Sequence, residues 1–281
     1  MSLQDSNMMV KQKDGVVTLH FPMLEEVEGI SHAFSTRLGG VSQGIFSSMN
    51  LSFGRGDSDE NVRENYRRIC AANGFDPEGL VASDQDHHTN VRIVTAKDKG
   101  KGIWRPKDYQ SVDAVVTQEP GVTLVTYYAD CVPLFFVDPV KRVVALAHAG
   151  WRGTVGRIGE VTVRKMEEAF GCRPQDLLAA VGPSIGPCCY EVDEPVYQQF
   201  AALNLKDSAR WMPESGEGKY KLDLWNINRQ ILSDAGVMPE HIQMAELCTC
   251  CNPDYLFSHR ASHGQRGGMA AFLQIRPSER V

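Results

Sequence analysis

The feature that most constrains this fold is the stretch 123–154, in which three apolar runs are interrupted only where a reactive side chain stands. The runs are residues 123–129, 133–137 and 143–147. Their length and their content of Val, Leu, Phe and Tyr predict three short buried strands. Cys131 lies between the first two strands, and His148 lies at the end of the third. A thiol and an imidazole so placed can form either a metal site or a nucleophile with its base.

The rest of the chain predicts short strands with interspersed helices. Further strands are expected at 16–21, 32–35, from 80, at 92–96, 112–117, 177–181, 241–247 and 269–275. Helices are expected at 60–72, from 154 to 170, at 194–203 and at 224–235, with Asp59, Thr154, Asp193 and Asp223 as their N-caps. Because strands follow one another between 112 and 149 without a helix, strict βαβ alternation is disfavoured. We therefore predict a single α+β domain over residues 1–281, with residues 1–15 at its periphery.

A long loop over residues 35–51 is rich in glycine and hydroxyl side chains and contains Arg37. Loops of this length without internal structure are usually functional or disordered. Because this one also contains Ile45, Phe46 and Leu51, we expect it to be ordered and packed by its own side chains. We expect a functional role for it rather than a merely solvated surface.

Composition and charge exclude several classes of function. A formal net charge of -6 gives no basic surplus, so the sequence indicates neither a nucleic-acid partner nor an anionic membrane surface. No apolar stretch reaches the ~18 residues of a membrane span, and the first residues lack a secretory apolar segment. We expect a cytoplasmic protein whose eight cysteines are thiols or metal ligands rather than disulfides.

A third candidate metal ligand lies in the polar segment 84–90, where His87 and His88 are adjacent. On an extended chain two adjacent side chains point to opposite faces, so at most one of them faces a given site. With Cys131 and His148, it would complete three protein ligands and leave a fourth position for water or substrate, as in catalytic zinc sites. The three residues lie far apart in the sequence, so spacing alone does not distinguish this site from a packed thiol and a histidine that ends a strand.

Seven short motifs appear in order along the chain. They are Ser35–Ser42 (STRLGGVS), Met49–Leu51, Gln85–His87, Ala129–Pro133 (ADCVP), His148–Gly153 (HAGWRG), Gly182–Gly186 (GPSIG) and Cys248-Thr249. In combination they closely resemble the laccase-domain (YfiH-like, polyphenol oxidase) family, whose members are regarded as purine nucleoside phosphorylases. The resemblance covers nearly the whole chain. It implies a YfiH-like fold of mixed, sandwich-like β-sheets flanked by helices.

The resemblance also implies a metal site and an activity. In that family the metal is held by the histidine of the Gln-x-His motif, the cysteine of ADC and the histidine of HAGWRG, which are His87, Cys131 and His148 here. The implied ion is Zn²⁺, with copper as a second option. The implied reaction is phosphate-dependent cleavage of adenosine, inosine, guanosine and S-methyl-5'-thioadenosine, accompanied by adenosine deamination.

Six further residues are candidates for the site. Their expected roles are anion clamping for Arg37 and Arg260, substrate orientation for Asn50, lining of the site for Cys248, and support of the metal ligands for Asp130 and Arg152. For the two anion clamps the alternative is an ordinary surface arginine. For Cys248 the alternative is a buried structural thiol.

The sequence departs from the family pattern in three places. His88 stands where glycine often follows the ligand, which leaves open which of the two adjacent imidazoles binds. Gly268 stands where relatives commonly carry arginine, so a basic group is either missing there or supplied by Arg266. His259 stands where tyrosine is common, and it either tunes the pocket or fills it.

Three other functions remain open. A copper-dependent polyphenol oxidase suits the His₂Cys set, but conventional multicopper oxidases need more histidines, arranged in His-x-His pairs; this chain has eight and no such pair. A metal-independent cysteine hydrolase would use Cys131 as nucleophile and His148 as base. A non-enzymatic binding protein would hold a structural metal with no open position. The sequence does not separate a monomer from a homodimer.

Overall fold

The three apolar runs form the strands β7 (Thr123–Tyr128), β8 (Val132–Asp138) and β9 (Val143–Ala149), as predicted. The computed structural model describes residues 6–277. β7 lies in one six-stranded sheet, whereas β8 and β9 pair as an antiparallel hairpin in a second. The chain therefore crosses from one sheet to the other at Cys131.

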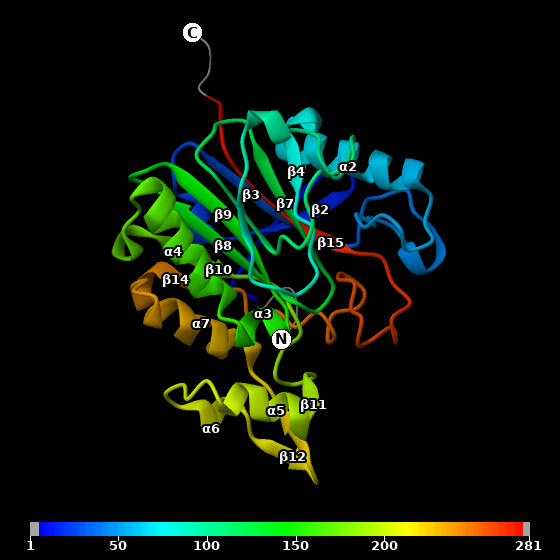
Figure 1. The fold of residues 1–281 in the computed structure, drawn as a ribbon. Coiled ribbons are helices and arrows are strands. Elements are labelled where there is room, and N and C mark those ends of the chain that lie inside the picture. The colour runs from blue at the N-terminus through cyan, green and yellow to red at the C-terminus, as the bar shows by residue number, and fades with distance from the viewer. Residues whose placement is uncertain (1–5, 278–281) are drawn as a thin grey trace.

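Two six-stranded sheets, both mixed, form the body of the molecule (Figure 1). The first contains, in order across the sheet, β1 (Met9–Lys13), β2 (Val16–His20), β3 (Ile30–Ser35), β15 (Met269–Ile275), β7 and β4 (Leu80–Ala82). The second contains β14 (Ile242–Met244), β10 (Leu178–Val181), β8, β9, β6 (Ala114–Thr117) and β5 (Val91–Ile93). Neighbouring strands are antiparallel except for the parallel pairs β4–β7, β5–β6 and β10–β14.

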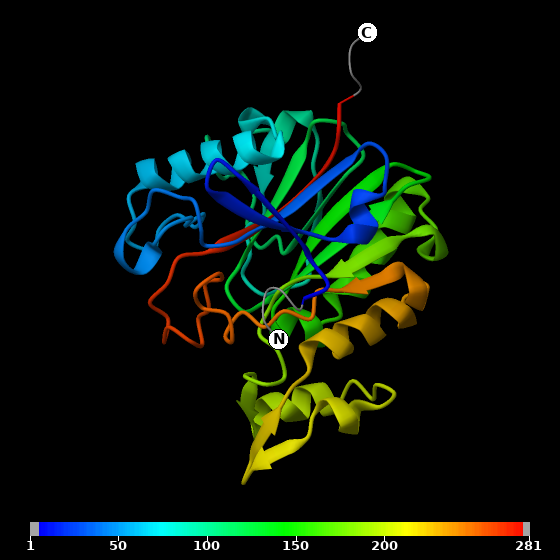
Figure 2. The ribbon, with the colours of Figure 1, turned by 180° about the vertical axis from the view of Figure 1, so that it is seen from behind.

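The sheets pack face to face, and helices cover their outer faces (Figures 1 and 2). In β8, Phe135 packs between the sheets, whereas Leu134 and Phe136 face α4 (Ile158–Phe170) and α7 (Leu224–Asp234). A strand buried on both faces needs an unbroken apolar run, which is what the sequence shows. The helix α2 (Asp59–Asn73) covers the opposite outer face through residues such as Tyr66. The expected α+β fold of sandwiched mixed sheets flanked by helices is confirmed.

A small lobe extends from the body and lies at the bottom of Figure 1. It consists of β11 (Glu191–Asp193), α5 (Glu194–Ala201), α6 (Ser208–Trp211), β12 (Glu214–Gly216) and β13 (Lys219–Lys221). The three strands form a separate antiparallel sheet. The sequence predicted only the first helix of this lobe, because strands of three residues with at most one buried side chain are too short to show a hydrophobic pattern.

The remaining elements are short. They are α1 (Pro22–Glu25), α3 (Trp151–Val155) and the 3₁₀ turns η2 (Gly44–Phe46), η3 (Pro77–Gly79), η4 (Ala96–Asp98), η5 (Pro174–Asp176) and η6 (Pro239–His241). The expected peripheral segment contributes β1, an edge strand with every residue exposed. Residues 1–5 and 278–281 lie outside the described part, so the single-domain boundary 1–281 stays a prediction. Within residues 6–277, no helix has the length and apolar character needed to cross a bilayer.

Two predicted helix starts are wrong. The cap of α2 is Ser58, whose hydroxyl accepts a hydrogen bond from the Asn61 amide at 3.1 Å, so Asp59 is already inside the helix. Thr154 does not begin the helix that ends at Phe170. It lies inside α3, which a left-handed residue, Arg157 (φ 57°), separates from α4. The Thr154 hydroxyl points inward and accepts a hydrogen bond from Asn228 at 3.1 Å, so it is not free to cap.

The long loop 35–51 is ordered, as expected, and a side chain from α2 secures it. Asn65 is fully buried, and its amide nitrogen donates to the hydroxyl of Ser42 and to the carbonyls of Ser48 and Asn50. Its amide oxygen accepts from the backbone of Val41 at 2.8 Å. A buried amide with all its hydrogen bonds made holds a loop in one conformation.

Candidate metal centre

The structure brings His87, Cys131 and His148 together from three separate segments. His87 lies on the loop between β4 and β5, Cys131 lies on the crossover between β7 and β8, and His148 lies in β9. Their ligand atoms are all within 4.8 Å of one another. The Cys131 Sγ and His87 Nε2 atoms are 4.0 Å apart, and the two imidazoles meet edge to face at 4.9 Å.

A buried carboxylate, Asp113, holds both histidines. Its Oδ1 lies 2.8 Å from Nδ1 of His148, so the other ring nitrogen, Nε2, is left for a ligand. The same carboxylate accepts hydrogen bonds from the backbone amides of Asp86, His87 and His88 at 3.2, 3.1 and 3.0 Å. Asp113 is 0% exposed. Sequence reasoning missed it, although an acidic residue inside the predicted strand 112–117 is a signal, because a buried charge requires partners.

The charges in the centre favour a thiolate. Burial by itself would raise the pKa of Cys131, but the charge and hydrogen bonds of His148 and His87 outweigh it and lower that pKa to about 6. Burial opposes protonation of His148, yet Cys131 and Asp113 raise its pKa to about 9. At neutral pH, therefore, the pair favours thiolate and imidazolium. The thiolate is the form of cysteine that binds metals and attacks electrophiles.

A glycine allows the three ligands to approach. A Cβ atom at Gly150 would lie 2.8 Å from Cδ2 of His87 and 3.2 Å from Sγ of Cys131. It would also lie 3.4 Å from Cε1 of His148. Any side chain at this position, directly after β9, would push the ligands apart.

The two adjacent histidines are separated by the backbone. His87 has a left-handed conformation (φ 71°) and joins the centre. His88 is exposed, and its Nδ1 lies 2.7 Å from the carboxylate of Asp86, which raises the pKa of His88. The chain is bent here rather than extended. His88 nevertheless faces solvent, as expected for one member of the pair.

A cavity of about 300 Å³ opens beside the centre. It is lined by Ser52, Phe53, Arg55, Ser83, Asp84, Gln85, His87, Gly102, Lys107, Tyr127, Tyr128, Ala129, Cys131, His148 and Arg266. Its lysine and two arginines differ in their surroundings. Lys107 forms an ion pair with Asp84, whereas burial, followed by the charge of Arg55, lowers the pKa of Arg266 to about 10. Two arginines that repel each other at a cavity wall favour an anion between them.

Of the two options for position 268, a missing basic group or a group supplied by Arg266, the structure is consistent with the second, because Arg266 lines the cavity. Position 268 itself has no room for a side chain, because a Cβ there would lie 1.9 Å from the hydroxyl of Ser52. His259 is exposed and does not line the cavity.

Four candidates from the sequence do not line this cavity: Arg37, Asn50, Cys248 and Arg260. The Arg37 guanidinium donates to the carbonyls of Ser47 and Pro253 and lies over the ring of Phe257. The Asn50 amide oxygen accepts from the backbones of Ser52 and Gly268 at 3.0 and 2.9 Å, which ties two cavity segments together.

The other two candidates belong to segments that contact Asp130. Cys248 is buried, and its sulfur accepts from the Gly186 amide at 3.2 Å. The Arg260 guanidinium donates to the carbonyls of Cys189 and Glu191, both at 3.0 Å.

The two supporting residues named from the sequence have different surroundings. Asp130 accepts from the hydroxyl of Thr249 at 2.6 Å and from the backbone of Arg260 at 2.7 Å, so it anchors the crossover that carries Cys131. Arg152 is exposed and lies over the ring of Trp151 at 4.2 Å. Asp130 therefore positions a ligand through the backbone, whereas the carboxylate that touches a ligand is Asp113.

The donor set fits a transition metal. Two imidazoles and one thiolate are the borderline to soft donors that suit zinc and copper, and three protein donors leave a coordination position toward the cavity. The hydrogen bond from Asp113 to His148 is the kind of support that fixes the tautomer of a ligating histidine.

Known proteins resemble the chain over most of its length. The family model described as "Multi-copper polyphenol oxidoreductase laccase" matches residues 31–276. Purine nucleoside phosphorylase YlmD of Bacillus subtilis is 39% identical over 247 residues, covering 86% of this chain and 87% of that protein. Purine nucleoside phosphorylase YfiH of Escherichia coli is 34% identical over 254 residues, covering 90% and 97%. The crystal structure of YlmD from Geobacillus stearothermophilus has a TM-score of 0.88 at 36% identity, covering 96% and 100%.

Proposed function

Because this chain belongs to the multi-copper polyphenol oxidoreductase laccase family and resembles relatives named purine nucleoside phosphorylase, we propose that it is a metal-dependent purine nucleoside phosphorylase. The proposed substrates are phosphate and adenosine, inosine, guanosine or S-methyl-5'-thioadenosine, with adenosine deamination as a companion activity. One observation carries the proposal: the His87–Cys131–His148 group forms the wall of a cavity that also contains two arginines.

We propose that His87, Cys131 and His148 hold the ion, with zinc as the expected metal and copper as an option. When bound, the ion would supply a positive charge that stabilises developing negative charge in the cavity. Asp113 orients His148 and, through backbone amides, the loop of His87. Gly150 leaves the space in which the three donors converge.

Arg55 and Arg266 are the proposed phosphate site. Both line the cavity. Burial, and after it the charge of Arg55, lowers the pKa of Arg266, and a phosphate between the two guanidinium groups would offset both effects. In phosphorolysis a phosphate oxygen forms a bond to the anomeric carbon of ribose while the bond to the purine nitrogen breaks. Such a reaction needs mainly orientation and charge stabilisation, which fixed guanidinium groups provide.

The purine is proposed to bind against the aromatic part of the wall, formed by Phe53, Tyr127 and Tyr128. Gln85 fixes this wall, because its amide oxygen accepts from the backbone of Tyr127 at 2.6 Å and its nitrogen donates to the carbonyl of Tyr127 at 2.8 Å. A cavity of about 300 Å³ lies at the lower end of the usual range for small-molecule sites.

The test is incubation of metal-defined protein with inosine and phosphate, followed by measurement of hypoxanthine and ribose 1-phosphate. We expect phosphate-dependent product from the wild type and its loss in Cys131→Ala and His148→Ala. His88→Ala is the matched control, because His88 is adjacent to a ligand but exposed; it should keep its metal, whereas His87→Ala should lose it. Full turnover by folded Cys131→Ala would refute the proposal. Ammonia release from adenosine without phosphate tests the companion activity.

A cysteine hydrolase is the second candidate, and one observation favours it. Cys131, His148 and Asp113 form a thiol–imidazole–carboxylate series, with the pKa of Cys131 lowered to about 6. The two candidates differ in their need for metal. Chelation should abolish phosphorolysis, whereas a cysteine hydrolase would keep its activity and lose it on alkylation of Cys131.

Copper-dependent phenol oxidation is the third candidate, favoured by the description of the family model. The His₂Cys donors suit a single copper. The eight histidines and the lack of a His-x-His pair do not suit a four-copper enzyme. Oxygen uptake with a phenol by copper-loaded protein, compared with zinc-loaded protein, decides between oxidation and phosphorolysis.

A further inference from the structure

Four thiols gather at a second place in the molecule. Cys188 and Cys189 belong to the turn that follows β10, and Cys248 and Cys251 belong to the segment that follows β14. Their sulfur atoms all lie within 4.8 Å of one another. The sulfur of Cys251 is 3.5 Å from that of Cys188 and 3.4 Å from that of Cys189. We call these four residues the cysteine cluster.

The spacing of these sulfurs is suited to one ion. A tetrahedral zinc site with Zn–S bonds of about 2.3 Å places its sulfurs about 3.8 Å apart. The sulfur–sulfur separations in the structure, from 3.4 Å to at most 4.8 Å, bracket that value. Small side-chain rotations would therefore complete the coordination shell. Four protein sulfurs leave no open position, which is the arrangement of a structural site rather than a catalytic one.

The surrounding backbone supports the cluster. The Gly186 amide donates a hydrogen bond to the sulfur of Cys248 at 3.2 Å, which holds that side chain in the cluster. The two segments that carry these cysteines are already joined through the backbone, because the Thr249 amide donates a hydrogen bond to the carbonyl of Ser184 at 3.0 Å. The Lys221 ammonium group lies beside the cluster and donates to the carbonyl of Cys188 at 3.1 Å.

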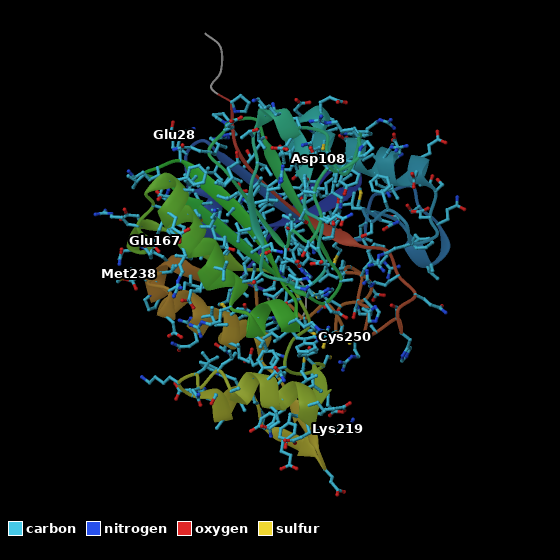
Figure 3. All side chains as sticks on the ribbon, in the orientation of Figure 1. Glu28, Asp108, Glu167, Lys219, Met238 and Cys250 are labelled. Carbon is cyan, nitrogen blue, oxygen red and sulfur yellow. The ribbon has the colours of Figure 1, made fainter. Side chains whose placement is uncertain are left out.

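The cluster lies where a bound ion would connect the small lobe to the body of the molecule. The turn of Cys188 and Cys189 leads directly into β11 of the small lobe, whereas Cys248 and Cys251 belong to the body. Figure 3 shows the neighbouring Cys250 at the lower edge of the body, above the lobe that carries Lys219. Crosslinking here would fix the root of the lobe to the segment of Thr249, which binds Asp130 next to Cys131.

We propose that Cys188, Cys189, Cys248 and Cys251 bind one zinc ion in a structural four-thiolate site, separate from the His87–Cys131–His148 centre. Zinc is the natural occupant because it accepts tetrahedral coordination by four thiolates without redox chemistry. The site does not depend on the nucleoside reaction. The proposal predicts that each chain holds a second metal ion, which can be removed while the ion of the His87–Cys131–His148 centre stays bound.

The test counts zinc per chain by elemental mass spectrometry in protein purified under reducing conditions. We expect about two zinc ions per wild-type chain and about one in Cys189→Ser or Cys251→Ser. Cys250→Ser is the matched control, because Cys250 adjoins the cluster without belonging to it; it should keep both ions. One zinc ion or fewer in the wild type, lost only on substitution of Cys131, overturns the proposal. Loss of zinc in Cys250→Ser overturns the assignment of the ligands.

A second measurement leaves the cluster intact and so avoids variants that fail to fold. In Cys131→Ala/His148→Ala the first centre is removed, and the protein should still bind about one Co²⁺ with the intense near-ultraviolet thiolate-to-cobalt absorption of a four-sulfur site. Absence of that absorption overturns the proposal. So does a mass corresponding to a disulfide among these cysteines together with no zinc uptake after reduction.

Discussion

One carboxylate, that of Asp113, controls the candidate metal centre at the scale of single residues. It contacts Nδ1 of His148 and three backbone amides of the His87 loop, so two ligands depend on it. The neutral amide of asparagine has the same shape but presents one oxygen instead of two. It cannot satisfy four donors, and it leaves no charge to hold the tautomer.

Asp113→Asn should therefore weaken zinc binding by about 10- to 100-fold while all three ligands remain. Competition with a chromophoric chelator measures the affinity. Asp138→Asn is the matched control, because Asp138 is also a fully buried carboxylate with backbone partners, Val140 and Lys141, away from the centre. Equal zinc affinity in Asp113→Asn and the wild type would contradict the assigned role of Asp113.

Cys131 should show an unusual pH dependence once the metal is removed. Its pKa is about 6 instead of the ordinary 9, whereas burial raises the pKa of Cys70 and Cys172 to about 12. The thiolate form therefore predominates above pH 6, and the rate of alkylation at Cys131 should rise with pH and level off near pH 7. Iodoacetamide labelling of metal-stripped protein, read by peptide mass spectrometry, gives this profile. A midpoint near 9 would contradict the thiolate–imidazolium pair.

At the scale of elements, the turn from β9 into α3 shapes the site. The strand carries His148 and the turn carries Gly150, where a Cβ would contact all three candidate ligands. The contact with the ring of His87 would be only 2.8 Å, which requires that ring to move. The glycine is needed here for close approach and not for its backbone angles, since its φ is -64°.

Gly150→Ala should consequently lower zinc occupancy at the first centre and phosphorolysis by at least about 10-fold, although no donor atom is changed. The control is Gly216→Ala, because the nearest atom there is 4.0 Å from the added Cβ and the backbone does not have a positive φ. Gly44→Ala would not serve, since Gly44 has a positive φ that disfavours any side chain. Zinc content and turnover are measured on both variants. Unchanged zinc content in Gly150→Ala would show that the ligands do not converge as the structure has them.

Two crossovers between sheets create the site at the scale of the whole molecule. The chain leaves the first sheet after β4 and β7, and it enters the second at β5 and β8. His87 lies on the first of these connections and Cys131 on the second. β4 and β7 are parallel neighbours, so their C-terminal ends lie side by side. Both crossovers therefore begin at the same end of the sandwich. The end of β9 meets them there and adds His148.

The packing of the sandwich also makes stability depend on pH. His20 and His32 are buried beside Glu25, and burial lowers their pKa to about 4 and about 3. In the unfolded chain both would titrate near 6.5. Below pH 6.5 the unfolded state therefore binds protons that the folded state does not, and the free energy of unfolding decreases as the pH falls.

We expect each of these histidines to cost about 1.6 kcal/mol of unfolding free energy between pH 6.5 and pH 5. Urea denaturation at the two pH values measures the change. The double variant His20→Asn/His32→Gln should flatten the dependence, whereas the exposed His259→Gln should not. A wild type that is equally stable at both pH values would mean that these imidazoles are protonated in the folded state.

Local pattern was sufficient to locate most elements and the types of reactive residue. The strands β7, β8 and β9, the helices α2 and α7, and the order of Cys131 and His148 along them follow from residues near in sequence. Asp223 caps α7 as expected, because its side chain accepts from the Asn226 amide three residues later. Capping and hydrophobic periodicity act over a few residues, so a sequence displays them directly.

Only the tertiary structure decided which distant residues meet. Nothing near His148 in the sequence names Asp113 as the group on its ring, and nothing near Arg37 indicated that Arg55 would line the cavity in its place. Likewise, Cys248 gathers with three cysteines and not with the cavity. Strand pairing and crossovers join residues that are dozens of positions apart, and that pairing depends on the packing of both sheets at once. The sequence thus determined which chemistry was present, and the folded chain decided which groups share a site.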